Sequence, residues 1–243
     1  MLLEIPTALI ATIVAVISAA FSVLAQFRLE KLKASLECDR YSRDKQGEAE
    51  RLISCYREPL VHAAHDLQSK LFNILRQGLL ELFYVKGNES EREYTVQNTV
   101  YVLAQFLCWR EIIRRELQFL DLGEVQSTRH LTELTDAIEK ILLTNEQDPV
   151  FRIFKGEQRA IGEKLIVYEH DRLVCMGYAA FVENQDEDFR KWFRKLENDI
   201  LTLTTDLSTR SERVIALQRA LIDLIDYLDP QYVRFQEQYR QKA

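Results

Sequence analysis

Glycine, proline and cysteine are scarce in this chain of 243 residues, which contains 7 Gly, 4 Pro and 4 Cys. Glycine and proline supply most tight turns, so their scarcity argues against a sheet-rich fold and favours long helices. The cysteines show no CxxC pair and no regular spacing, which fits neither a disulfide framework nor a zinc site. We therefore interpret all of them as reduced, mostly structural thiols: Cys38, Cys55, Cys108 and Cys175.

The sequence also lacks the short motifs that mark nucleotide-binding proteins and hydrolases. It contains no GxxxxGK[ST], no GxGxxG and no GxSxG, and only 4 histidines are available as bases. A net charge of −6 argues against the broad basic face that nucleic-acid binding needs. We predict no cofactor and no nucleic-acid partner, identify no catalytic residue, and favour a binding role over an enzymatic one.

One long segment lacks charge altogether, namely residues 5–27, IPTALIATIVAVISAAFSVLAQF. About 20 apolar residues in a helix, each adding ~1.5 Å, cross the ~30 Å hydrocarbon core of a bilayer. Basic residues follow the segment, whereas only Glu4 precedes it, so the positive-inside rule predicts a single-pass anchor with residues 1–4 outside and the rest cytoplasmic. A cleaved secretion signal is the alternative, but the acidic start and the length argue against it. The basic residues are Arg28, Lys31 and Lys33.

Small residues line one face of this predicted membrane span. Ala15, Ala19 and Ser22 stand four and three residues apart, and such stripes let two helices approach closely inside a bilayer. We therefore predict that these residues form a contact between anchors of two copies. The alternative is that alanine and serine are simply common in membrane helices.

Residues 28–58 contain no proline and are predicted to form a juxtamembrane helical stalk. Pro59 should end it, because the residue before a proline avoids the α region. Leucines at helical spacing then predict a helical bundle over 59–185, in which the apolar residues 100–109 form a buried central helix. Within the bundle, residues 165–182 fit either a helix, which we favour, or a short hairpin that turns at His170-Asp171.

Residues 186–229 carry the strongest periodic pattern. Apolar residues recur at alternating steps of four and three, with Arg210 as the polar exception, which is typical of a coiled-coil or bundle seam. We predict one long helix, although a capping box beginning at Thr209 leaves a helical hairpin open. A homo-oligomer or a helical protein partner would cover the seam near Leu217, Leu221 and Leu224. Residues 230–243 are predicted to be a polar tail.

Two glycines of this glycine-poor chain, Gly156 and Gly162, fall within the segment GEQRAIGE at 156–163. Glycine inside a helix costs ~1 kcal/mol relative to alanine, so we expect a compensating close approach of another backbone or of a ligand. Tight helix packing, with Arg159 in an internal ion pair, is the favoured interpretation. The ligand-binding hypothesis combines this segment with the charges that follow residue 109, and its residues are Arg110, Glu111, Glu157, Arg159 and Glu163.

Glu58, His62 and His65 stand at positions i, i+4 and i+7, so one helix would place them on a common face. A carboxylate and imidazoles at such spacing can bind a transition metal. A di-metal bundle site needs a second Glu-x-x-His motif, which the sequence lacks. We therefore predict a solvated or core-edge histidine pair and no metal.

The sequence predicts an all-α protein with one N-terminal transmembrane helix, a cytoplasmic helical bundle and a long heptad-patterned C-terminal helix. The function that fits this plan is a membrane-tethered interaction or regulatory module that acts through helix–helix association. The alternative is a membrane-anchored enzyme, or a small-molecule or lipid sensor, with a polar site inside the bundle.

Overall fold

The chain is mainly helical, which confirms the predicted all-α class, although a two-stranded sheet is also present. This computed structural model describes the backbone of residues 7–119, 126–170, 172–184 and 186–243, and most of their side chains from residue 54 onward. In chain order the elements are α1 (Thr7–Arg76), η1 (Leu80–Val85), α2 (Glu89–Phe119), α3 (Gln126–Leu143), α4 (Lys155–Lys164), β1 (Ile166–Glu169), β2 (Arg172–Cys175), α5 (Tyr178–Glu183), α6 (Glu187–Arg190), α7 (Arg194–Thr205), α8 (Glu212–Leu228) and η2 (Glu237–Tyr239).

The chain divides into two units, Met1–Glu48 and Ala49–Ala243. The first unit consists largely of the first part of α1, where the side chains of Leu29, Leu32 and Leu36 are exposed to solvent. The second unit contains the last part of α1 and all the other elements, and it forms a helical bundle around one hydrophobic core.

Within the described part of the chain, no helix has a stretch that is both long enough and apolar enough to cross a membrane. The predicted span, residues 5–27, falls mostly outside the residues whose side chains are described, and this includes Ala15 and Ala19. Ser22 is exposed, and its hydroxyl donates a hydrogen bond of 2.9 Å to the main-chain oxygen of Ser18 within the same helix.

The predicted boundary at Pro59 is wrong, because α1 continues through Pro59 to Arg76. A proline inside a helix removes one main-chain hydrogen bond and costs ~3 kcal/mol. Burial of the apolar residues that follow it offsets this cost, since Leu60, Leu67 and Leu71 are almost completely inaccessible. Before the proline, the side chain of Arg57 donates to the main-chain oxygen of Leu228. This hydrogen bond attaches α1 to the end of α8.

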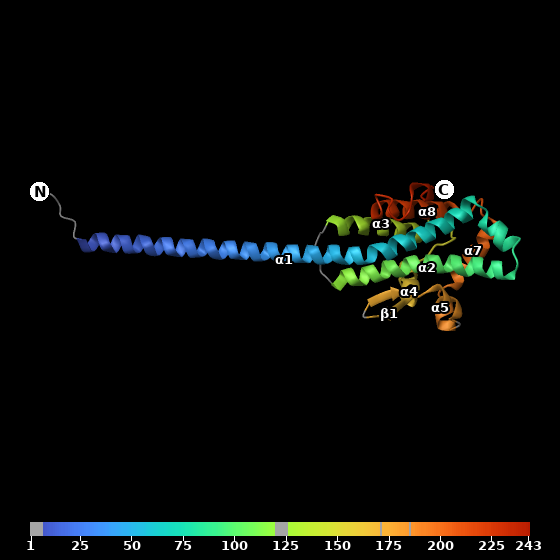
Figure 1. The fold of residues 1–243 in the computed structure, drawn as a ribbon, viewed down its shortest axis with the longest axis horizontal. Coiled ribbons are helices and arrows are strands. Elements are labelled where there is room, and N and C mark those ends of the chain that lie inside the picture. Colours follow the sequence, from blue (N-terminus) through green and yellow to red (C-terminus); the bar gives the residue numbers. More distant parts are fainter. Residues whose placement is uncertain (1–6, 120–125, 171, 185) are drawn as a thin grey trace. The chain divides into compact units, whose positions relative to one another are not determined.

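Helix α2 is the buried central helix, as its apolar sequence predicts. Between residues 100 and 109 every residue except Gln105 and Trp109 is buried. In Figure 1, α2 lies between α1 on one side and α4, β1 and α5 on the other. The central helix therefore contacts both halves of the bundle, which explains why it has no polar face over these residues.

Residues 165–182 form a hairpin followed by a short helix, so the favoured helical prediction is wrong and the open alternative is right. Strands β1 and β2 pair antiparallel, with Ile166 opposite Cys175 and Glu169 opposite Arg172. His170 starts the turn with φ 47°, the left-handed conformation that two-residue hairpin turns require, and Asp171 lies outside the described residues. The hydroxyl of Tyr101 donates to the main-chain oxygen of Met176 at 3.0 Å, so a contact with α2 holds the hairpin in place.

The predicted long C-terminal helix is broken, and α6, α7 and α8 replace it. Residues 206–211 separate α7 from α8, so the hairpin alternative is right about the position of the break. The carboxylate of Asp206 forms this turn, because it accepts hydrogen bonds from the Thr209 hydroxyl at 2.5 Å and from the Arg210 side chain at 3.2 Å. The predicted capping box, with Thr209 as its N-cap, does not start α8, because the helix has Ser211 at its N-cap and the Thr209 hydroxyl donates to Asp206 instead.

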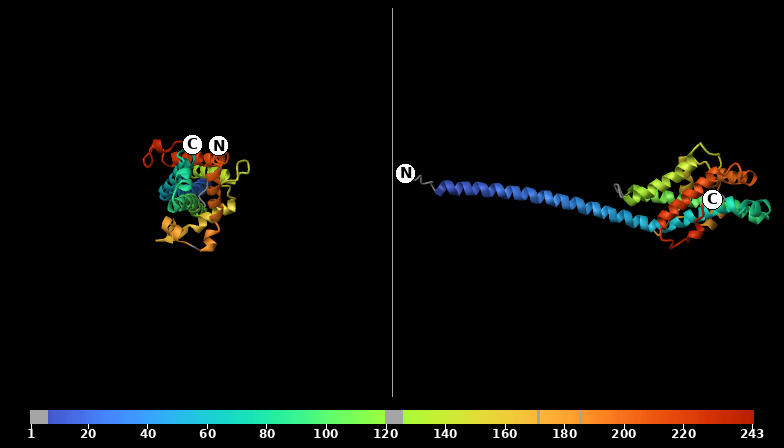
Figure 2. Two further views of the ribbon diagram at one scale, coloured as in Figure 1. Left: turned by 90° about the vertical axis from the view of Figure 1, so that its right-hand side faces the viewer. Right: turned by 90° about the horizontal axis from the view of Figure 1, so that it is seen from above.

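The apolar seam packs into the core of its own domain. Phe193, Ile200, Leu217, Leu221 and Leu224 are all fully buried. Helices α8 and α3 lie side by side in Figures 1 and 2, and this neighbour covers much of the seam. The structure thus explains the heptad pattern without a second copy, and the predicted oligomer contact at Leu217, Leu221 and Leu224 is wrong for the folded domain.

Candidate functional site

A pocket of about 300 Å³ opens between α1, α2, α3 and α4, all within the second unit. Its floor is apolar, and its walls carry four cationic side chains, two carboxylates and two threonines. The lining residues are Leu60, Arg110, Ile113, Arg114, Leu131, Thr132, Thr135, Asp136, Glu139, Lys155 and Arg159.

Glu139 is the most enclosed charge in the pocket, with only 11% of its side chain exposed. It is held between two cations, because Arg110 pairs with one carboxylate oxygen and the Nζ of Lys155 lies 2.7 Å from the other. Buried Gln158 fixes this arrangement, since its Oε1 accepts from Arg110 at 2.9 Å and its Nε2 donates to the main-chain oxygen of Ile153, also at 2.9 Å. One wall of the pocket is therefore rigid and carries a surplus of positive charge.

Two other charged side chains of the pocket, Arg159 and Asp136, are exposed to solvent. Arg159 reaches it from α4 and Asp136 from α3, and neither is within ion-pair distance of an oppositely charged group in the described part of the chain. Burial lowers the pKa of Arg110, Asp136 and Glu111 raise it, and the positive charges of Arg159 and Arg114 lower it further. Burial is thus the main cause of the lowered pKa of Arg110.

The structure divides the five predicted ligand-binding residues among three places. Arg110 and Arg159 line the pocket. Glu111 is buried and accepts from Arg114 at 2.6 Å and from Arg115 at 2.8 Å, and Arg115 also pairs with Glu163 at 2.7 Å. Glu157 caps α4, because its carboxylate accepts from the main-chain nitrogen of Phe154 at 2.9 Å. Arg159 is exposed and forms no ion pair with a described side chain, so the predicted internal ion pair is not found in this part of the chain.

Gly162 has the close-approach role that its helical position predicts. A Cβ atom added there would lie 2.6 Å from the main-chain oxygen of Leu107, so α4 crosses α2 at backbone contact. A Cβ atom added at Gly156 would have open space around it, with no neighbouring atom within 4 Å. Only the second of the two glycines is therefore required for packing, and it places Arg159 and Lys155 over the pocket.

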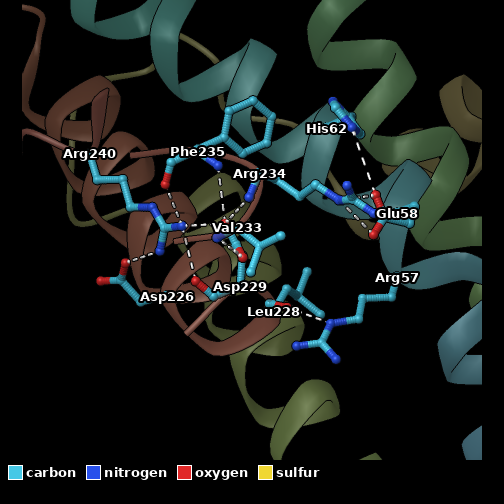
Figure 3. Close-up of polar contacts among 10 residues, drawn as sticks. All are labelled: Arg57, Glu58, His62, Asp226, Leu228, Asp229, Val233, Arg234, Phe235 and Arg240. Atoms are coloured by element: carbon cyan, nitrogen blue, oxygen red, sulfur yellow. Dashed lines mark hydrogen bonds and ion pairs between the residues drawn. The ribbon is translucent and has the colours of Figure 1, made fainter. Parts of the chain in front are cut away.

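The candidate metal residues are used for packing and for an ion pair (Figure 3). Glu58 pairs with Arg234 at 2.9 Å, and the ring of His62 meets Phe235 edge-on at a centroid distance of 5.1 Å. His65 stacks on the same Phe235 ring at 3.6 Å. In the described part of the chain, no group of three His, Cys, Asp or Glu side chains is placed to hold a metal ion. The core-edge histidine interpretation therefore fits their positions.

Sequence reasoning missed most of the pocket, because its residues come from helices that are distant in the chain. The sequence pattern is that of ordinary solvated charges on amphipathic helices for Asp136, Glu139 and Lys155. The only sequence signal for them is the i, i+3 spacing of Asp136 and Glu139 on the polar side of α3, which is common in surface helices. Only the crossing of α4 over α2 brings them beside Arg110.

Comparison with known proteins assigns no family: no protein-family model, no curated protein and no solved structure matches the chain. The pocket is therefore the basis for a functional interpretation. In its described lining there is no cysteine, histidine or serine. The hydroxyl of Thr135 already donates to the main-chain oxygen of Leu131 at 2.9 Å.

Proposed function

We propose that this chain is a single-pass membrane protein whose helical domain, residues 49–243, acts as a regulatory receptor for a small anionic ligand. The observation that carries the proposal is the pocket between α1, α2, α3 and α4, where the lining has four cations and two carboxylates beside apolar side chains. Glu111 neutralises one of these cations, Arg114, and one net positive charge is left. Its volume of about 300 Å³ lies at the lower end of the ~300–1,000 Å³ range of ligand pockets. We propose a ligand with one anionic group for the cations and a short apolar body for Leu60, Ile113 and Leu131.

The membrane tether rests on the sequence of residues 5–27. This segment has no charged residue and is long enough for a bilayer, and Arg28, Lys31 and Lys33 directly follow it. Basic residues on that side support a cytoplasmic location for the domain. Pairing of two anchors through Ala15, Ala19 and Ser22 stays part of the proposal.

Binding is favoured over catalysis at this pocket. Nucleophilic catalysis needs an activated hydroxyl, thiol or amine beside a free base. Of the two lining carboxylates, the buried one, Glu139, is already neutralised by Arg110 and Lys155. A receptor needs only the positive charge and the apolar floor, both of which are in place before a ligand arrives.

Calorimetric titration of the full chain in detergent micelles with phenyl phosphate tests the proposal. We expect saturable binding, and none with benzyl alcohol, which has the ring without the phosphate. Arg159→Ala should weaken binding about tenfold or more, because a hydrogen bond to a charged group contributes ~1.5–3 kcal/mol. Its unfolding temperature should not change, because Arg159 is exposed.

Arg194→Ala is the matched control, since Arg194 is an exposed arginine of α7 that does not line the pocket. It should bind phenyl phosphate as the unaltered chain does. Equal affinities for the two variants would show that the pocket is not the binding site. If neither phenyl phosphate nor pyrophosphate binds, the anionic-ligand proposal is wrong.

A further inference from the structure

The predicted polar tail, residues 230–243, is folded onto α1 and α8, and it is held there mainly through its main chain. Buried Gln68 of α1 donates to the main-chain oxygen of Tyr239 at 2.9 Å. Buried Gln218 of α8 donates to the oxygen of Gln241 at 2.8 Å and accepts from the nitrogen of Ala243 at 3.0 Å. The two glutamine side chains also bond each other at 3.2 Å. We call Gln68, Gln218 and Asp229 the docking surface and residues 233–243 the C-terminal segment.

Asp229 is the second point of attachment (Figure 3). Its carboxylate accepts from the main-chain nitrogens of Val233, Arg234 and Phe235 at 2.9–3.1 Å. The guanidinium of buried Arg240 donates to the same carboxylate at 2.5 Å. The docking surface thus recognises the main chain of the segment, which bends around Asp229 and includes the short helix η2, and a single arginine.

The C-terminal segment has one packed apolar side chain, Phe235, which stacks on the ring of His65. Val233 and Tyr239 are 67% and 57% exposed, respectively. Hydrogen bonds to water can replace most of the contacts described, because the exchange of protein for water partners changes the free energy little. A segment held in this way can leave its site and bind again, unlike a helix that carries core leucines.

The short connection before the segment is strained. Tyr232 has φ 55°, a left-handed conformation that is unfavourable for a bulky side chain. Pro230 stiffens the same connection, since its ring fixes φ. Extension of residues 230–232 would relieve the strain, and short strained connections favour exchange of the following segment between copies.

We propose that the docking surface takes the C-terminal segment of a second copy of this chain, so that two copies exchange segments and form a dimer. The occupant fits because it is the same peptide: every contact from Val233 onward re-forms in the partner, including that of Arg240 with Asp229. The proposal is independent of the anion-binding pocket, none of whose residues contacts the segment through the bonds described. It also places self-association at a surface other than the buried heptad seam.

A native ion pair allows a test without substitution. The Nζ of Lys242 in the segment lies 2.6 Å from the carboxylate of Asp223 on α8, and both side chains are half exposed. Full-length chains, ¹⁵N-labelled and unlabelled, are mixed in detergent over a range of concentrations. A carbodiimide then joins the amine of Lys242 to the carboxylate of Asp223. Mass spectrometry shows whether the two peptides joined by each cross-link carry the same nitrogen isotope.

Exchange predicts mixed Lys242–Asp223 peptides whose share rises with concentration toward random pairing of copies. The ion pair of Lys155 with Glu139, at 2.7 Å between α4 and α3, is the internal control and must stay unmixed. If the Lys242–Asp223 peptides are unmixed at every concentration, the segment remains on its own chain and the proposal is overturned.

A matched pair of variants tests the strained connection. Tyr232→Gly and Tyr232→Ala both remove the ring that lies against the Arg240 guanidinium, but only glycine accepts a positive φ without strain. We expect a severalfold smaller mixed fraction for Tyr232→Gly than for Tyr232→Ala. Equal fractions would overturn strain at Tyr232 as the cause of exchange.

Discussion

Gly162 is the residue on which the crossing of α4 over α2 depends. Its absent side chain lets the main chain of α4 approach the oxygen of Leu107, where a Cβ atom would lie at 2.6 Å. A contact this short forces the backbones apart. The same crossing carries Lys155 and Arg159 to the pocket, so packing and binding depend on one glycine.

We predict that Gly162→Ala lowers the free energy of unfolding by ~1–3 kcal/mol, the usual cost of overpacking a tight contact. Gly156→Ala is the control in the same helix, where no atom lies within 4 Å. It should be neutral or stabilising by up to ~1 kcal/mol, because alanine restricts the unfolded chain. Urea unfolding of both variants measures the difference, and similar effects would refute the close contact.

The pKa of Glu111 reflects two opposing influences. Burial raises it, and hydrogen bonds from Arg114 and Arg115 lower it by more, so that the pKa lies below its ordinary value of 4.5. A carboxyl whose pKa is lowered in the folded state stabilises the fold above the pKa it has in the unfolded chain. That stabilisation is lost as the pH falls through the folded pKa.

Glu111→Gln should therefore be less stable than the unaltered chain at pH 7. Part of the loss of stability that the unaltered chain shows below about pH 4.5 should be missing in the variant, because there is no carboxylate left to protonate. Urea unfolding at several pH values between neutrality and the acid limit measures both curves. Parallel curves at every pH would contradict the assigned role.

Single residues show what the sequence could and could not predict. Glycine scarcity made Gly162 recognisable as a contact point, because a helical glycine needs a compensating role. The partner of that contact was not recognisable, since Leu107 is 55 positions away. Arg159 was predicted to be internal and is exposed, because its environment depends on how α4 crosses the bundle rather than on its neighbours in the chain.

Arg213 joins two elements that no sequence motif connects. It is fully buried at the start of α8, and its guanidinium donates to the main-chain oxygens of Thr144 and Asp148 at 2.8 Å and also to that of Ile141. These oxygens lie at the end of α3 and in the loop that follows. The arginine thus satisfies carbonyls that the last turn of α3 leaves without helical partners.

We predict that Arg213→Met destabilises the domain by ~3 kcal/mol or more, because several buried carbonyls lose a charged donor at once. Arg210→Met is the control, since Arg210 lies three residues earlier in the exposed turn and pairs only with Asp206 within the described bonds. Its effect should stay within ~1 kcal/mol. Thermal unfolding distinguishes the two, and equal losses would mean that Arg213 has no special role.

Periodicity predicted which faces are buried but not where elements end. The heptad pattern of 189–228 correctly marks buried residues, yet it continues across the turn at 206–211, because Asp206 and its hydrogen bonds break the helix without breaking the spacing. The reverse happened at Pro59, where a local breaker is overridden by burial of Leu60 and the leucines after it. The hairpin at 166–175 was misassigned because short apolar runs fit a buried helix and a strand equally well.

The whole molecule combines a bundle whose heptad seam is filled from within and a charged pocket between four helices. The apolar faces of α8 are covered by its own domain, which removes the predicted helix–helix association through that seam. The two proposed routes to self-association that remain are exchange of the C-terminal segment and pairing of the anchor helices. The functional proposal then depends on whether residues 5–27 hold the domain at a membrane on its cytoplasmic side.

Cysteine labelling tests this tether directly. It needs no reporter protein fused to Ala243, which is buried and would be disturbed by the fusion. All four cysteines follow the proposed anchor, and Cys55 is exposed. A membrane-impermeant maleimide is applied to intact cells and to inverted, carbonate-washed membrane vesicles from the same cells. A tethered cytoplasmic domain should be labelled at Cys55 only in the vesicles. Labelling in intact cells, or loss of the chain from the washed vesicles, would contradict the tether.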